Sequence, residues 1–479
     1  MKNINKLYIS CLALSLGLTI TSCEKQLSMP PANARVEGTA ITDEKTAQIV
    51  LNGVYAQFAN VTSNNITSWD LNNTSGGYLS GTLGYGAGSV QDESNDNVQA
   101  GSTPGLWAYA YRVVNAANGL IEGIESIDVS KFTGNSRNEK LAEARFLRAY
   151  GHFKLLMFFS EWKNLNSENG VLIREEFSSL SKAAKKRSTV KESYDHILAD
   201  LDFAVANAKA TNPNHYASSW AAKVLKMRVL ASRGQQADFQ TIITLANDVI
   251  ANSPYQLEAK LKDIFHQKGL SSSEVILGVK PQANQEAYYY ILSRAYYPGA
   301  SSVYAVPPGF IALLEGDPRK DWIVGPTTPY AAYGANKNFY LKYIPFGTAP
   351  TQVSETNYAM RLSEVYHLKA EAIIRSNGSL ADAKAAIKTV MEKAQVTDFS
   401  ALDAITTHAD LWKFNTKEVL KGFSTEDAVE WYTLIRMPLA SVTQIKPTIV
   451  RESQFYFPIP QTEFEMNYLF GQQNEGYGI

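Results

Sequence analysis

A long helical pattern runs through "LAEARFLRAYGHFKLLMFF", residues 141–159 of a chain of 479 residues. Its apolar side chains recur every three or four positions, as they do along one face of an α-helix. These positions are Phe146, Ala149, Tyr150, Phe153, Leu156 and Met157. The same stretch carries Glu143 and Arg145, and a charge inside a core needs a partner of opposite sign. The stretch therefore predicts a core helix that is joined to its neighbours partly by ion pairs.

The same periodicity continues on both sides of this stretch. It is found over residues 106–124, 194–205, 220–231, 239–250, 362–373 and 383–391. Two close helical pairs are predicted, 189–209 with 217–233 and 360–375 with 380–394, each joined by a short polar turn. Paired helices with short turns are typical of tetratricopeptide-like scaffolds, although the clean 34-residue consensus is absent. We expect a mainly α fold.

Two regions interrupt the helical pattern. Residues 60–104 are rich in Gly, Asn and Ser, and residues 269–350 are rich in Pro and carry short β-like runs such as Val275-Ile276-Leu277. Long loops within a compact protein are usually functional. The sequence therefore predicts one helical domain over residues 41–479, with long irregular loops near 60–104 and 269–350 and few short strands.

The N-terminus has the features of an export signal. Residues 1–22 combine Lys2 and Lys6 with an apolar stretch too short to span a membrane. Ile20-Thr21-Ser22-Cys23 resembles a bacterial lipoprotein box, and removal of the leader leaves Cys23 as the one thiol of the chain. We expect lipidation at Cys23 and a flexible tether over residues 23–40. The alternative is a soluble secreted protein with an incidental cysteine.

Composition and motifs exclude several classes of function. The formal net charge is −1, so the chain lacks the basic excess that nucleic acid requires. The six histidines are scattered, and neither a Gly-x-Ser-x-Gly motif nor a P-loop is present. "DESNDN", residues 92–97, could bind Ca²⁺, but the EF-hand template fails at Asn97 and Thr103, which favours a plain turn. We expect no metal site and no cofactor.

Several segments together are similar to those of one known family. They are "LNGVYAQF" (51–58), the helix at 141–159, "GDPRKDW" (316–322), "MRLSEVYHLKAEAIIRSNG" (360–378) and "FYFPIPQTEFEMNYLFGQQNEGYG" (455–478). From the lipoprotein box to the C-terminus, the chain resembles the SusD/RagB family of Bacteroidetes outer-membrane lipoproteins. One segment departs from the family pattern, because residues 417–437 keep Trp431, Leu434 and Arg436 but lack its Glu-Gly-x-Arg part.

The family motifs contain charged residues inside helical patterns. We expect Glu143 with Arg145, and Arg361 with Glu364 and Glu371, to form buried or half-buried ion pairs between helices. These residues are interpreted as structural, not catalytic.

The resemblance implies a function in nutrient capture. It predicts a lipid-anchored protein of the outer membrane that faces the exterior, binds a glycan and passes it to a TonB-dependent transporter without breaking a bond. Sugar rings stack on aromatic faces, while amides and carboxylates meet their hydroxyls. Both long loops supply such groups. The candidate ligand-binding residues are Trp69, Asn73, Tyr78, Tyr85, Asn95, Asp96, Tyr296, Tyr330 and Tyr333.

Three alternatives stay open at this stage. A protein of the same fold could capture peptides, through backbone pairing and fewer flat rings. A glycoside hydrolase would need two carboxylates about 5–10 Å apart flanking the sugar. A helical scaffold without a small ligand would leave both aromatic loops packed flat.

Overall fold

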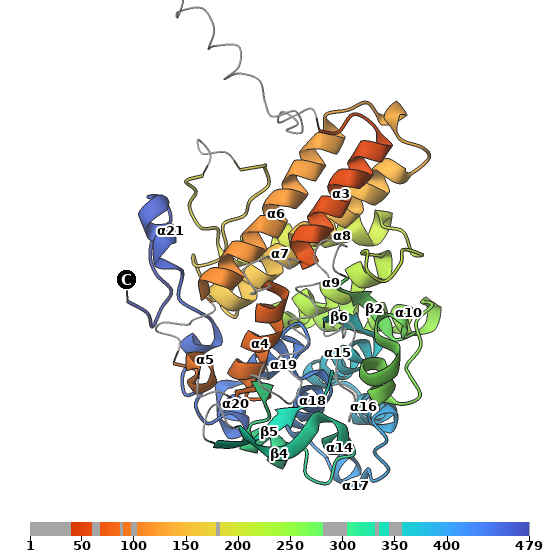
Figure 1. Ribbon diagram of the computed structural model, residues 1–479, viewed down its shortest axis with the longest axis vertical. Coiled ribbons are helices and arrows are strands. Elements are labelled where there is room, and N and C mark those ends of the chain that lie inside the picture. Colours follow the sequence, from red (N-terminus) through yellow and green to blue (C-terminus); the bar gives the residue numbers. More distant parts are fainter. Residues whose placement is uncertain are drawn as a thin grey trace, which may run out of the picture.

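The structure of the protein is a computed structural model that describes residues 40–59, 68–86, 90–96, 103–178, 183–280, 304–330, 335–343 and 357–478. The fold is mainly α-helical, as predicted, with a few short strands. Long helices pack side by side at one end of the molecule, and strands β4 and β5 lie beside α14 at the other end (Figure 1).

The first group of helices is built from successive elements that pack on one another. They are α3 (Glu44–Ala59), α6 (Thr103–Glu125), α7 (Ser136–Phe159), α8 (Val190–Asn207), α9 (Ser219–Arg233) and α10 (Gln236–Asn252). The second group comprises α15 (Leu362–Arg375), α16 (Leu380–Lys393), α18 (His408–Phe423) and α19 (Val429–Arg436). Helix α10 packs on α15 and so joins the two groups. Both predicted helical pairs, α8 with α9 and α15 with α16, are confirmed.

Helix α7 lies at the centre of the first group. It packs against α6 and α8 and is buried on nearly all sides, which explains why charged residues along it need partners. Arg148 donates to Asp200 through two nitrogens, each 2.7 Å from a carboxylate oxygen. Lys154 lies 2.6 Å from Asp427. His152 is packed in the same interior.

The strands form two small antiparallel sheets. One has the order β1 (Gly84–Tyr85), β3 (Tyr304–Ala305), β5 (Ala335–Tyr340) and β4 (Val324–Tyr330). The other pairs β2 (Val275–Gly278) with β6 (Tyr358–Arg361), and all residues of both strands are buried. Short helical elements complete the described fold. They are α4 (Ser68–Ser80), α5 (Gln91–Ser94), α11 (Leu261–Asp263), α13 (Pro308–Leu313), α14 (Lys320–Ile323), α17 (Ser400–Asp403), α20 (Leu439–Ile445) and α21 (Gln461–Met466).

The expectation that residues 60–104 form an irregular loop is wrong for its central part. Gly76 and Gly77, read from the sequence as loop glycines, lie inside helix α4. A Cβ at Gly76 would stand 2.6 Å from the Cα of Ala428, and one at Gly77 would stand 2.6 Å from the Cβ of Leu83. These glycines therefore allow close packing of the helix, a requirement that composition cannot distinguish from a turn.

The turn between α18 and α19 is buried at the meeting point of several elements. It consists of Ser424–Ala428, and we call it the buried turn. Thr425, Asp427 and Ala428 all have positive φ, at 59°, 52° and 59°, a conformation that non-glycine residues rarely adopt. Such backbone persists only where the surroundings hold it. The surroundings here are side chains from both helical groups and from both sheets.

Asp427 joins the buried turn to the first helical group and to α4. Its carboxylate accepts from Tyr150 and Lys154 of α7 and from Arg228 of α9, each over 2.6 Å. Its backbone N–H donates to the side-chain oxygen of Asn73 in α4 over 2.8 Å. Three helices from distant parts of the chain, α4, α7 and α9, thus converge on one residue.

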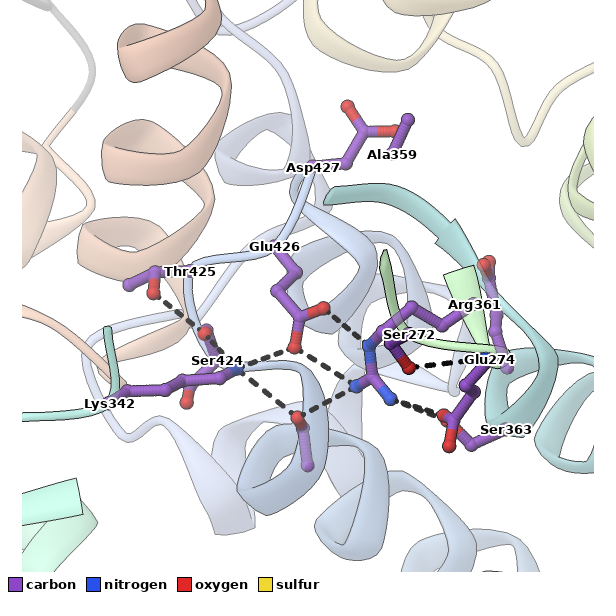
Figure 2. Close-up of polar contacts among 12 residues, drawn as sticks. Ser272, Glu274, Lys342, Ala359, Arg361, Ser363, Ser424, Thr425, Glu426 and Asp427 are labelled. Carbon is purple, nitrogen blue, oxygen red and sulfur yellow. Dashed lines mark hydrogen bonds and ion pairs between the residues drawn. The ribbon is translucent and has the colours of Figure 1, made fainter. Parts of the chain in front are cut away.

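Glu426 joins the same turn to the sheets. Its carboxylate accepts from Arg361 at the end of β6 and from Lys342 beyond β5, each at 2.6 Å (Figure 2). Arg361 also donates to Glu274, which lies beside β2, over 2.6 Å. Burial opposes ionisation of Glu426, but Arg361 and Lys342 hold its pKa below the ordinary value. Anions and cations therefore alternate through Glu274, Arg361, Glu426 and Lys342, which we call the buried cluster.

The predicted ion pairs are right in kind but wrong in their partners. Arg361 pairs with Glu274 and Glu426, not with Glu364 or Glu371. Glu364 pairs with Arg228, and Glu371 pairs with Arg436 and Arg375. These partners lie on other elements, so spacing within one helix could not reveal them.

The predicted pair of Glu143 with Arg145 does not form either. Glu143 accepts a hydrogen bond from Tyr55 over 2.6 Å, and burial raises the pKa of Glu143 to about 7. Arg145 instead lies 3.9 Å from Glu125. The two side chains leave α7 in different directions, because neighbours two positions apart do not share a helix face.

Removing one charge of the cluster should destabilise the whole fold. In Arg361→Leu, Glu274 and Glu426 stay buried without their cation, so we expect a loss of about 3–5 kcal/mol in unfolding free energy. Urea denaturation followed by tryptophan fluorescence measures it. Lys191→Leu is the matched control, since Lys191 is exposed and pairs with Asp195 on the surface, where a pair contributes about 0–1 kcal/mol. Equal midpoints for the two variants would contradict this role of Arg361.

Glu430, in the first turn of α19, predicts a pH dependence of stability. Burial raises its pKa from 4.5 to about 8, so the folded protein keeps this proton at neutral pH whereas the unfolded chain loses it. Its contribution to stability therefore falls as the pH rises from about 5 to 8. Glu430→Gln removes this pH-dependent contribution. The melting temperature of the variant, relative to that of the wild type, should therefore rise as the pH increases from 5 to 8. If the melting temperatures of the two proteins differed by a constant amount from pH 5 to 8, the raised pKa of Glu430 would be refuted.

Candidate functional site

A cleft of about 380 Å³ opens beside strands β1 and β3. It lies between segments that are distant in sequence: the C-terminal end of α4 with β1, the residues around β3, and the chain after α20. Its lining residues are Tyr78, Gly81, Leu83, Gly84, Tyr85, Glu93, Ala305, Val306, Pro307, Pro308, Asn338 and Lys446. The volume falls within the range of roughly 300–1,000 Å³ that is typical of small-molecule sites.

Strand pairing holds the two sides of the cleft together. Tyr85 of β1 is paired with Tyr304 of β3, and Gly84 is paired with Ala305. A Cβ at Gly84 would lie 3.3 Å from the ring of Pro307, so a larger residue there would press on that wall. The ring of Tyr85 is half-buried and that of Tyr78 is 8% exposed. The cleft thus offers apolar and aromatic surface with an open side.

Two charged residues supply the polar wall. Glu93 accepts a hydrogen bond from the backbone N–H of Tyr85 over 2.5 Å. The ammonium of Lys446 donates to the backbone oxygen of Glu93 over 2.7 Å. Burial lowers the pKa of Lys446, and Glu93 partly opposes that effect. Asn338 also lines the cleft, and its side-chain N–H donates to the backbone oxygen of Gly325 over 3.0 Å. The cleft therefore combines a carboxylate, an ammonium and an amide.

Of the predicted ligand-binding residues, the structure brings Tyr78 and Tyr85 together in this cleft. Asp96 is exposed and does not line it. Tyr296 and Tyr333 lie outside the described residues, as do the side chain of Tyr330 and the lipidation site Cys23.

Three other predicted residues are buried and serve the fold. The Trp69 ring packs 5.0 Å from that of Phe58 and 5.6 Å from that of Tyr150, and it is 0% exposed. Asn73 donates to Asn357 and accepts from the buried turn. Asn95 donates to the backbone oxygen of Leu79 over 2.9 Å. Their faces and amides are occupied within the protein, so the expectation that they meet a ligand is not supported by their positions.

The segment that could bind Ca²⁺ is organised by its own contacts. Residues 91–94 form α5, and Asn95 accepts from Thr448 over 2.6 Å. Over the part of the chain that the structure describes, no group of three or more His, Cys, Asp or Glu side chains could hold a metal ion.

Several lining residues of the cleft were not predicted from the sequence. Glu93 was noticed only as part of an oxygen-rich turn, and Pro307, Asn338 and Lys446 were not singled out. Lys446 follows α20, far from both loops in sequence, and it carries no motif that could have signalled its position.

Among the helices within the described residues, none has the length and apolar character that crossing a bilayer requires.

The paired helices and the two small sheets define a helical-repeat scaffold of the SusD type. The family model described as "Starch-binding associating with outer membrane" matches residues 38–230, and the model of the SusD family matches residues 324–437. The chain belongs to the SusD/RagB family.

Individual relatives agree with this assignment. A SusD-like protein of Bacteroides ovatus is 23% identical over 342 residues, which cover 62% of this chain and 60% of the relative's length. A SusD superfamily protein of Bacteroides thetaiotaomicron has the same fold, with a TM-score of 0.72 at 21% identity, covering 90% of this chain and 100% of that one. A laminarin-binding SusD-like protein matches with a TM-score of 0.68 at 18% identity, covering 91% of this chain and 100% of that one.

Proposed function

We propose that this protein binds an oligosaccharide or polysaccharide in the cleft beside β1 and β3. The observation that carries the proposal is that two aromatic residues, Tyr78 and Tyr85, line the same opening as three polar ones, which are Glu93, Asn338 and Lys446. Aromatic rings stack on the C–H face of a sugar, while the amide and the charged groups meet its hydroxyls. The glycan ligand of a structural relative, laminarin, supports the class of ligand.

The proposed setting is the outer membrane. The lipoprotein box at Ile20–Cys23 supports acylation of Cys23, which would hold the body beside the bilayer. The family description associates its members with the outer membrane. We propose that the protein faces the exterior and passes its glycan to a TonB-dependent transporter.

Capture without cleavage fits the cleft best. Glycoside hydrolysis requires two carboxylates across the scissile bond. Glu93 is the one carboxylate among the described residues that line the cleft, and one of its oxygens already accepts from Tyr85. A ligand would therefore leave chemically unchanged.

Peptide capture by the same fold is the second candidate. An extended peptide would add to a free strand edge through backbone hydrogen bonds. The edge strand at the cleft is β1, and its Tyr85 N–H already donates to Glu93. A glycan, which needs no such donor, is favoured.

Substitution of the half-buried ring tests the proposal. Tyr85→Ala removes a stacking face, and we expect about a tenfold or greater loss of affinity for laminarin or starch oligosaccharides by isothermal titration calorimetry. Trp69→Phe is the matched control, because Trp69 is buried away from the cleft and its substitution should leave affinity unchanged. Chromatography of the glycan after incubation should find no shortened product.

Three results would refute parts of the proposal. If Tyr85→Ala bound the glycan with wild-type affinity, the cleft would be excluded as the binding site. Binding of peptides but not of any glycan would favour the second candidate. Shortened glycan products would identify an enzyme.

A further inference from the structure

A second opening, which shares no lining residue with the cleft, lies along helices α3 and α6. These two helices run side by side (Figure 1). It has a volume of about 550 Å³, and we call it the α3–α6 groove. Its lining residues are Ala40, Ile41, Val50, Gly53, Val54, Gln57, Ala116, Gly119, Glu122, Gly123, Ser126 and Phe177. From Ala116 to Ser126 a helix rises roughly 15 Å, so the groove is elongated along the helix axes.

Three glycines line this groove, and packing within the chain explains two of them. A Cβ at Gly119 would lie 2.9 Å from the ring of Phe177, and one at Gly123 would lie 2.6 Å from Ile41. A Cβ at Gly53 would have nothing within 4 Å. Gly53 stands inside α3, where glycine is unfavourable relative to alanine. No contact among the described residues requires a glycine there, whereas a molecule lying against the helix backbone would.

Two of the three polar side chains that line the groove are engaged within the chain, and the third, Gln57, is exposed. The Glu122 carboxylate accepts from the backbone N–H of Phe177 over 2.6 Å, and the Ser126 hydroxyl donates to the backbone oxygen of Gly123 over 2.9 Å. Apart from Gln57, the remaining walls are formed by glycines and by aliphatic or aromatic side chains, including Val50, Val54 and Phe177. An occupant therefore needs apolar surface and a narrow, extended shape, which are the properties of a hydrocarbon chain.

The position of the first described residues indicates the source of such a chain. Ala40 and Ile41, the first described residues, themselves line the groove. Residues 24–39 connect them to Cys23, and a segment of that length reaches at most roughly 60 Å, several times the length of the groove. An acyl group on Cys23 is thus within reach of the groove.

We propose that the α3–α6 groove binds one fatty acyl chain of the protein's own N-terminal anchor. This inference rests on acylation of Cys23, part of the proposed function, but not on glycan binding. An acyl chain seated between α3 and α6 would hold the body close to the bilayer in one orientation, where a free tether would allow many.

The capacity of the groove can be tested without the anchor. The Cys23→Ala protein should bind the fluorescent fatty acid 11-(dansylamino)undecanoic acid, with increased and blue-shifted emission. A Cβ at position 53 meets nothing within 4 Å, so Gly53→Leu places its side chain in the groove, and we expect it to weaken this binding about tenfold or more. Lys45→Leu adds the same side chain to an exposed site on α3 outside the groove and should leave binding unchanged. An absence of probe binding, or equal binding by Gly53→Leu, would overturn the proposal.

The source of the chain needs a second experiment. Cells supplied with a diazirine-bearing fatty acid would acylate the full chain, and mass spectrometry after irradiation would locate the cross-links. Cross-links within residues 44–59 and 103–125 that disappear in Gly53→Leu are expected. Cross-links to lipid alone would overturn the proposal while the anchor stands. An unacylated Cys23 would overturn the proposal and the anchor together, and laminarin binding, measured separately, would be unaffected.

Discussion

The buried turn Ser424–Ala428 is the constraint on which the rest of the structure depends. It places two carboxylates, Glu426 and Asp427, where water cannot reach them, and three of its residues adopt positive φ. Neither feature is favourable alone, because buried anions and left-handed backbone both cost free energy. Cations brought from α7, α9, β6 and the end of β5 offset that cost. The elements must therefore assemble together, since each supplies a charge that another needs.

The buried turn also determines where the cleft lies. Helix α4 packs through Gly76 directly on Ala428, and Asn73 of the same helix accepts from the Asp427 N–H. The C-terminal end of α4 carries Tyr78 into the cleft. On the other side, Lys342 fixes the end of β5, which pairs with β3. Residues outside the lining of the cleft thus position both of its walls, which gives the charged positions of the family motifs a structural role.

The helices could be predicted from the sequence, and the partners of their charges could not. The stripe in residues 141–159 and the paired helices follow from local periodicity, which depends on spacing within one element. Arg361 pairs with Glu426, which lies 65 positions away in the sequence, and periodicity within one helix cannot reveal a partner so distant. Two lining residues of the cleft, Tyr78 and Tyr85, belong to the glycine-rich segment 60–104 that composition singles out, although Tyr85 lies in strand β1 and not in a loop. Trp69 was misjudged because a helix such as α4, whose glycines serve close packing, has the composition of a loop. Lys446 had no signal, since tertiary folding alone brings it beside Glu93.

The buried turn is held by all the elements around it, so it should open only when they separate. Its amides make this measurable, because Thr425 N–H donates to Glu430 and Asp427 N–H donates to Asn73. Native-state hydrogen exchange, followed by mass spectrometry of peptides spanning residues 424–428, is the most direct test. We expect these amides to exchange as slowly as the most protected amides of α7, through global unfolding. Exchange orders of magnitude faster than α7, with the fold intact, would contradict it.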